Sequence, residues 1–140
     1  MVKNSFNENW SRWQPLMTAL TGSYEIIKVG DNAERLKIVL LSVNSERKLE
    51  ISIDYAWGYR FTNESFRLKL IDQLSQKYGD DFYVGWPIFK VENSTYLKWI
   101  EDEAFGTISE SRMFHFVLIG TESIVDIATA AEPKIKILSS

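Results

Sequence analysis

The stretch that decides the fold runs from Leu49 to Phe61 and reads LEISIDYAWGYRF. Apolar side chains occupy its odd-numbered positions, and polar or small side chains occupy its even-numbered positions. This strict alternation predicts one long β-strand with a single apolar face in the core. At about 3.3 Å per residue the strand would span about 43 Å, which is longer than most strands. We therefore expect a bulge or bend at Gly58.

Two more strands are predicted upstream, over Ser23–Val29 and Arg35–Val43, with turn residues after each. A four-residue turn at Asn44–Arg47 would place Leu40 opposite Ile51. This turn and the five-residue turn before it give one shared apolar face, which is the agreement expected of a three-strand antiparallel meander. The face comprises Tyr24, Ile26, Leu36, Ile38, Leu40, Ile51, Ile53 and Tyr55.

Apolar residues at helical spacing predict three helices. In the first, Pro15 fits only the first turn or a kink. The second is capped by Thr62 or Asn63, ends at Gly79, and is expected to cross the apolar face of the meander. The third is capped by Ser94. The three segments are residues 6–20, 64–78 and 95–105.

The C-terminal part predicts further strands. Residues 82–88 alternate, but Pro87 cannot donate to a ladder, so this is either an edge strand or a strand only from Ile88 to Val91. Arg112–Ile119 is apolar on both faces, which predicts a central strand, and Ile124–Ala130 returns from it as a hairpin. Lys134–Leu138 is predicted as a last short strand.

The prediction is therefore an α+β fold with a mainly antiparallel sheet, made of the three-strand meander and the C-terminal hairpin, with two or three helices. The expected order is α-β-β-β-α-β-α-β-β. The length of 140 residues fits a single globular domain over residues 1–140.

Composition excludes several classes of function. The chain has no Cys and one His, which excludes disulfides, thiolate catalysis and zinc sites built from Cys or several His. A net charge of -3 without a basic run disfavours nucleic-acid binding. No signal peptide or membrane span is recognisable, so we expect a cytoplasmic protein. The common phosphate-loop, dinucleotide, zinc-protease and serine-hydrolase motifs are absent, so no cofactor or metal is predicted.

His115 and Asp126 form the first candidate site. The predicted hairpin pairs His115 with Ala128 and Val117 with Asp126, which puts the imidazole and the carboxylate diagonally on one face, about 7–8 Å apart. A carboxylate that orients an imidazole is how a general base is built. The alternative is a hydrogen-bonded core pair. No nucleophile is recognisable, and Ser94 and Ser109 are candidates only as any serine would be.

The polar face of the long strand is the second candidate. Glu50, Asp54 and Arg60 could line a cleft, although Lys37 is predicted to pair with Asp54 across the sheet. The solvated side of a one-sided sheet is the simpler interpretation. Tyr59 or Arg60 could also assist His115 and Asp126 if a pocket lies there.

Two aromatic stretches with a glycine suit ligand or partner contacts. In Tyr55–Arg60 the odd residues belong to the predicted core face, so core packing is favoured. In Phe82–Pro87 core and interface are about equally indicated. The acids at the end of the third helix oppose the helix macrodipole at a small cost, which allows either solvated charge or an acidic binding surface.

Two functions remain. The preferred one is a non-enzymatic interaction protein, whose small size, acidic charge and composition resemble those of small bacterial immunity or antitoxin proteins. That resemblance implies a protein partner, such as a basic toxin or nuclease domain, and an exposed edge strand would also allow a homodimer. The predicted partner surface comprises Tyr83, Trp86, Trp99, Glu101, Asp102 and Glu103. The alternative is a small-molecule-binding domain or enzyme with a pocket near His115 and Asp126.

Overall fold

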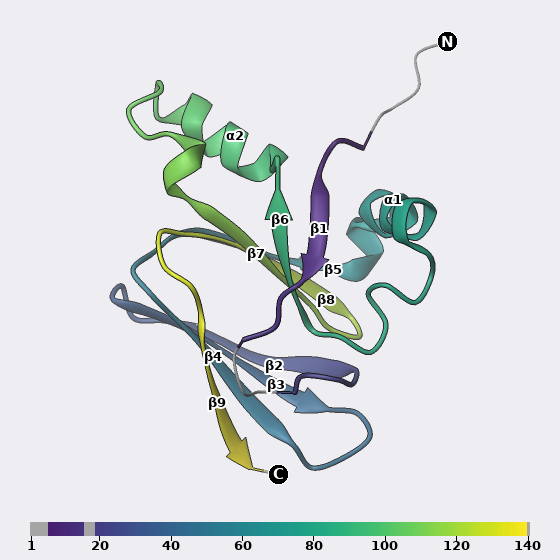
Figure 1. The fold of residues 1–140 in the computed structure, drawn as a ribbon. Coiled ribbons are helices and arrows are strands. Elements are labelled where there is room, and N and C mark those ends of the chain that lie inside the picture. Colours follow the sequence, from purple (N-terminus) through teal and green to yellow (C-terminus); the bar gives the residue numbers. More distant parts are fainter. Residues whose placement is uncertain (1–5, 16–18, 140) are drawn as a thin grey trace.

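The computed structural model describes residues 6–15 and 19–139. Within these residues, nine strands form two antiparallel sheets and are joined by two α-helices, which confirms the α+β class (Figure 1). The five-stranded sheet has the order β1 (Asn9–Arg12), β6 (Ile88–Glu92), β7 (Phe114–Ile119), β8 (Ser123–Thr129) and β5 (Ala56–Asn63). The four-stranded sheet has the order β2 (Tyr24–Asp31), β3 (Arg35–Ser42), β4 (Lys48–Asp54) and β9 (Lys134–Ser139).

The predicted meander is present as β2, β3 and β4. Its register differs from the prediction, because Leu40 lies opposite Leu49 rather than Ile51. The amide of Ser42 donates to the carbonyl oxygen of Arg47 at 2.9 Å, so the turn again has four residues but begins one residue earlier than predicted. A shift of two residues keeps every side chain on its face. The buried face therefore holds as predicted, apart from Tyr55, which is exposed, and Ile26, which is half-buried.

The expected long strand is two strands that belong to different sheets. The break lies at Tyr55, whose φ of 55° is left-handed and whose amide donates to the carbonyl oxygen of Glu34 at 2.9 Å. A bulge is present between Ala56 and Gly58, as predicted, but the chain changes sheet before it. Alternation could not reveal the break, because a single left-handed residue leaves the period-2 pattern intact on both sides.

This break overturns the core assignment of the aromatic residues that follow it. The exposed fractions are 67% for Tyr55, 46% for Trp57, 38% for Tyr59 and 54% for Phe61. The reason is that β5 is an edge strand of its sheet, so only one side of it is covered by a neighbouring strand. Phe61 borders a shallow groove with residues 26–29 of β2 at the open margin between the two sheets.

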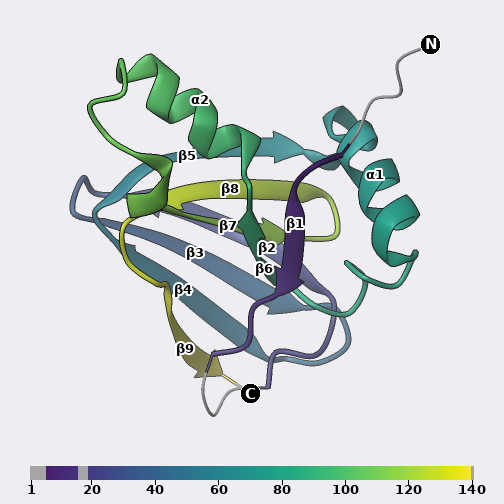
Figure 2. The ribbon, with the colours of Figure 1, turned by 45° about the horizontal axis from the view of Figure 1, so that its top comes forward.

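Both helices lie on the face of the five-stranded sheet that points away from the four-stranded sheet (Figures 1 and 2). Helix α1 (Leu68–Tyr78) follows a short 3-10 turn (Glu64–Phe66) that Asn63 caps, and it ends at Gly79. Helix α2 (Thr95–Glu103) is capped by Ser94 as predicted. The expectation that α1 covers the meander is wrong, because the five-stranded sheet covers that face instead (Figure 2).

The predicted N-terminal helix is also wrong in the described residues. Trp10 lies in β1, which pairs with β6, and the amide of Trp13 continues this pairing by donating to Ile88 at 3.0 Å. The difference comes from pairing with β6, which a local helical spacing cannot reveal, and Pro15 further disfavours a helix at Gln14. Leu16 and Met17, which contributed to the helical pattern, lie outside the described residues.

The C-terminal strands agree with the prediction. Strand β7 is the central strand of its sheet, β8 returns beside it, and β9 adds to the edge of the meander. Of the two alternatives for residues 82–91, the strand from Ile88 onward is correct, although it is an interior strand between β1 and β7. A core fills the space between the sheets, and the outer face of the five-stranded sheet carries the helices and a buried polar cluster. No helix in the described part of the chain is long and apolar enough to cross a membrane.

Candidate functional site

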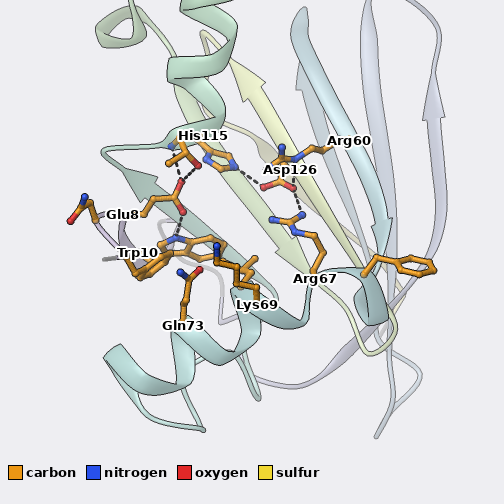
Figure 3. Close-up of a pocket in the computed structure, with 13 residues that line it drawn as sticks. Glu8, Trp10, Arg60, Arg67, Lys69, Gln73, His115 and Asp126 are labelled. Atoms are coloured by element: carbon orange, nitrogen blue, oxygen red, sulfur yellow. Dashed lines mark hydrogen bonds and ion pairs between the residues drawn. The ribbon is translucent and has the colours of Figure 1, made fainter. Parts of the chain in front are cut away.

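His115 and Asp126 are in direct contact on the helix side of the five-stranded sheet (Figure 3). The predicted register is correct, since His115 lies opposite Ala128 and Val117 lies opposite Asp126. Because the two side chains reach toward each other across the diagonal, Nε2 of His115 and Oδ1 of Asp126 form a hydrogen bond of 2.8 Å. The hairpin turn fixed this register in the sequence, so the contact was predictable.

Ser94 completes a buried chain of three residues. Its Oγ lies 2.7 Å from Nδ1 of His115 and also accepts the amide N–H of Leu97 at 3.0 Å, as the cap of α2. In the tautomer that matches all partners, the Ser94 hydroxyl donates to Nδ1 and Nε2–H donates to Asp126. Serine, histidine and aspartate thus meet as in a nucleophilic triad, which the sequence alone did not show.

The burial of this chain favours a structural role over nucleophilic catalysis. Ser94 and His115 are each 1% exposed and Asp126 is 0% exposed. The Ser94 oxygen already holds both the helix cap and the imidazole, so a substrate carbonyl has no approach to it. The chain instead fixes the start of α2 to the β7–β8 hairpin. Ser109, the other serine considered, caps the 3-10 turn at Glu110–Arg112 and bonds to Ser111.

Two arginines converge on Asp126 from different segments. Nε of Arg60, in β5, donates to Oδ2 at 2.9 Å, because β5 pairs with β8 and places Arg60 directly opposite Asp126. Nη1 of Arg67, at the start of α1, donates to the same oxygen at 2.6 Å. The guanidinium of Arg60 also stacks on the ring of Tyr96 in α2, 4.4 Å from its centroid. One carboxylate therefore joins β5, α1, β7 and β8.

The charge state of Asp126 follows from this environment. Burial alone raises the pKa of a carboxyl group, because it penalises the charged form. The hydrogen bond from His115 and the charges of Arg60 and Arg67 act in the opposite direction and outweigh burial, so the pKa of Asp126 lies well below its ordinary value of 3.8. Asp126 is ionised throughout the physiological pH range.

A pocket of about 360 Å³ opens beside this cluster. It lies between the first half of α1, the segment before β1 and the outer face of the sheet (Figure 3). Glu8 borders it and accepts three hydrogen bonds, from the indole N–H of Trp10 and from the amide and hydroxyl of Thr95. Its lining is both polar and aromatic and comprises Phe6, Asn7, Glu8, Trp10, Arg60, Phe66, Arg67, Lys69, Leu70, Gln73, Thr95, His115 and Asp126.

The six residues of the predicted partner surface do not share one face. Trp86 is 7% exposed, and its indole N–H donates to the carbonyl oxygen of Trp13, so the prediction that Trp86 is a surface residue is wrong. Tyr83 is half-buried and contacts Ser75 of α1 through its hydroxyl. Trp99 and the acids Glu101, Asp102 and Glu103 lie on α2, well separated from α1 (Figure 1).

We call the residues at the C-terminal end of α2 and just beyond it the α2 surface; helical spacing turns Trp99 and Glu101 to opposite sides of the helix, and Glu101 is half-buried. Its five members are Trp99, Glu101, Asp102, Glu103 and Phe105. The exposed fraction is 58% for Trp99 and 95% for Phe105. Among the described residues, none of the three acids forms an ion pair. Charge and aromatic area are thus both available to a partner.

The other polar candidates are placed differently from the prediction. Asp54 pairs with Arg35 at 2.8 Å and with Lys134 at 3.0 Å, rather than with Lys37, because of the shift in register. Glu50 and Arg60 are not on one face, since β4 and β5 belong to different sheets. In the described ranges, no group of three His, Cys, Asp or Glu is arranged to hold a metal ion.

Sequence reasoning missed Arg67 and Glu8 as members of the site. Arg67 stands in an irregular segment between a 3-10 turn and α1, and Glu8 precedes β1, so neither belongs to a periodic pattern. Only the pairing of β5 with β8 would have pointed to the region, and no local signal specifies that pairing.

Comparison of the chain with protein-family models, curated proteins and solved structures found no match.

Proposed function

We propose that this chain is a small cytoplasmic interaction protein without catalytic activity, which occupies a basic protein partner through the α2 surface. The observation that carries this proposal is the combination of three unpaired acids with two exposed aromatic rings on one short helix and its end. Exposed aromatic residues are enriched at protein interfaces, and acidic charge steers and selects a basic partner. The resemblance to small bacterial immunity and antitoxin proteins in size, charge and composition also favours a protein partner.

Edge strand β5 adds support, because it lies under α2. A Cβ on Gly58 would come within 3.1 Å of the Tyr96 hydroxyl, and Tyr96 stacks on Trp99 with a centroid distance of 6.2 Å. The α2 helix therefore packs over the face of β5 that holds Gly58 and Arg60, while Tyr59 and Phe61 point to the opposite face, and the outer edge of β5 pairs with no other described strand. An exposed edge with large aromatic side chains is the kind of surface that proteins normally cover.

The test is a capture experiment from the native host with a matched control for charge. One variant carries Glu101→Lys, Asp102→Lys and Glu103→Lys on α2. The control carries Glu25→Lys, Glu46→Lys and Glu132→Lys, which are exposed acids on the other sheet, its turn and the segment before β9. Both variants have the same net charge, so only the position of the change differs.

We expect the wild type and the control variant to retain one stoichiometric basic partner, and the α2 variant to lose it. Raising the salt concentration should release the partner, because screening weakens exposed charge interactions. Equal retention by all three proteins would refute the α2 surface. Equal loss in both variants would show a general charge effect and would refute it as well.

A second candidate function is favoured by the pocket beside Asp126. A concave site of about 360 Å³, with polar groups converging on it and aromatic walls, has the size and character of a small-molecule site. In this function the buried Ser94–His115–Asp126 chain is the scaffold that holds the pocket in shape. Native mass spectrometry of the chain purified from its host tests it, through a retained small molecule.

A further inference from the structure

The pocket beside Asp126 carries an excess of positive charge. Arg60, Arg67 and Lys69 line it with three cationic groups, and Glu8 and Asp126 line it with two carboxylates (Figure 3). The carboxylates have hydrogen-bond partners on all of their oxygens, whereas the cationic groups have unused donors. Both oxygens of Glu8 accept hydrogen bonds from neutral donors, and both oxygens of Asp126 are in bonds to His115 and the arginines.

The cations have donors to spare. A guanidinium has five N–H groups, and each arginine uses only one of its nitrogens, on Asp126. The side chain of Arg67 is only 17% exposed, yet no described residue leaves a buried side-chain nitrogen without a partner. The remaining nitrogens of Arg67 therefore reach solvent, and Arg67 lines this pocket. Lys69 is exposed and forms no ion pair with any described residue.

Asp126 acts as a support for these arginines rather than as a ligand contact. It is fully buried behind them, and it fixes two guanidinium groups through one oxygen. Guanidinium groups held in this way are positioned in advance for a planar or tetrahedral oxyanion, so less side-chain entropy is lost on binding. Without a bound anion, the three cations share the pocket with two carboxylates, of which only Asp126 forms ion pairs with any of them.

The start of α1 adds to the same field. Arg67 is the N-cap of this helix of 11 residues and makes no side-chain capping bond, and the first turn contains no acid. The first amide N–H groups of a helix lack partners within it and favour negative charge. Lys69 and Leu70 of this turn line the pocket. The helix thus reinforces the arginines, which carry the inference.

We propose that this pocket binds a small organic molecule through an oxyanion, either a carboxylate or a phosphate, held by Arg60, Arg67 and Lys69. Trp10, Phe66 and Leu70 supply apolar lining for the body of the molecule. The proposal specifies the second candidate function and is independent of partner binding, because it is tested on the purified chain alone.

Benzoate and phenyl phosphate are the probes, and benzyl alcohol is the neutral control with the same ring. Each is titrated into the wild-type protein while amide and indole N–H signals are followed by NMR. We expect shifts at the indole N–H of Trp10 and at residues 68–70 for at least one anion, with at least tenfold weaker binding of benzyl alcohol. The better of the two anions identifies the oxyanion. Weakening of its affinity with added salt is expected.

Two substitutions test the residues. Arg67→Gln should weaken binding of the better anion by about tenfold to a hundredfold, as expected for the loss of charged hydrogen bonds. Lys69→Gln should weaken it by about threefold, since an exposed cation contributes less. The matched control is Lys136→Gln, an exposed lysine on β9 in the other sheet, which should leave binding unchanged.

Binding of both anions no more tightly than benzyl alcohol would overturn the proposal. So would equal affinities in the Lys69→Gln and Lys136→Gln proteins, a comparison that stands even if Arg67→Gln fails to fold. A failed titration would leave the capture experiment unaffected, and the loss of a protein partner would leave the titration unaffected. The two proposals can therefore fail separately.

Discussion

Asp126→Asn is the substitution that probes the centre of this structure. The change keeps the shape of the side chain and removes the charge on which Arg60, Arg67 and His115 converge. Breaking one partner of a buried charge pair usually costs about 3–5 kcal/mol. Arg60 is 46% exposed and can be hydrated after the change, whereas Arg67 is 17% exposed and His115 is buried.

We therefore expect a loss of about 3 kcal/mol in the free energy of unfolding, at the lower end of that range. A chain of this size has about 7–20 kcal/mol of stability in total, so the protein should still fold. The midpoint of thermal unfolding should fall by about 10 °C, at about 3–4 °C per kcal/mol. Urea unfolding followed by circular dichroism measures the first quantity, and a thermal melt measures the second.

The effect should also depend on pH. Since the pKa of Asp126 is lowered in the folded state, ionised Asp126 contributes its full stabilisation above about pH 4, near the pKa of the unfolded chain. That stabilisation is lost as the pH falls from about 4 toward the lower folded pKa. The difference between wild type and Asp126→Asn should therefore be smaller at pH 3 than at pH 7.

Asp54→Asn is the matched control, because Asp54 also binds two cations but at the surface. Exposed ion pairs contribute little, so only a small shift in the unfolding midpoint is expected. A loss in Asp126→Asn no larger than that in Asp54→Asn would refute the role given to the buried cluster. An equal loss at pH 3 and pH 7 would refute the assignment of the pH dependence to Asp126.

Three further substitutions test other parts of the structure. Ser94→Ala removes both the α2 cap and the bond to His115, and should cost about 1–3 kcal/mol in urea unfolding and speed hydrogen exchange at Leu97, whereas the serine-to-alanine control at Ser109 should leave that exchange unchanged. Tyr55→Val should cost about 1–2 kcal/mol in the free energy of unfolding, because a β-branched residue resists the left-handed backbone at this position. Tyr59→Val in the same edge region should change that free energy by no more than about 0.5 kcal/mol. Equal effects of the two substitutions would contradict backbone strain at Tyr55. Gly120→Ala should cost about 1–3 kcal/mol in thermal unfolding, since its Cβ would lie 3.2 Å from the backbone nitrogen of Ile26, and a neutral result would show that β2 can move away from the β7–β8 turn.

The sequence predicted well those features that depend on local periodicity. Strands β2, β3, β4, β7 and β8 and both helices were recognised because their apolar residues repeat with the period of the element. Contact between His115 and Asp126 followed from a short hairpin turn that fixes the register. Where a loop was misjudged, as between β3 and β4, the shift was even and the buried face was preserved.

The features that were missed depend on pairing between distant segments. The apolar spacing from Trp10 onward imitates a helix, and only pairing with β6 shows that this region is a strand. The exposure of Trp57 and Tyr59 depends on the place of β5 at the end of a sheet, which its own sequence does not encode. Arg67 and Asp126 are 59 positions apart in the sequence, so no local pattern could predict the cluster of charged residues around Asp126.

The corner at Tyr55 also has a consequence for assembly. Alternation of side chains continues through it from β4 to β5, so the sequence on either side is compatible with one uninterrupted extended segment. Rotation of one backbone torsion toward the extended region would relieve the left-handed conformation and carry the second half of the chain away from the first. Two chains opened in this way could complete one another by exchanging halves, with every sheet contact re-formed between molecules. The residue that folds one chain into two layers is thus also the hinge at which a domain-swapped dimer would form.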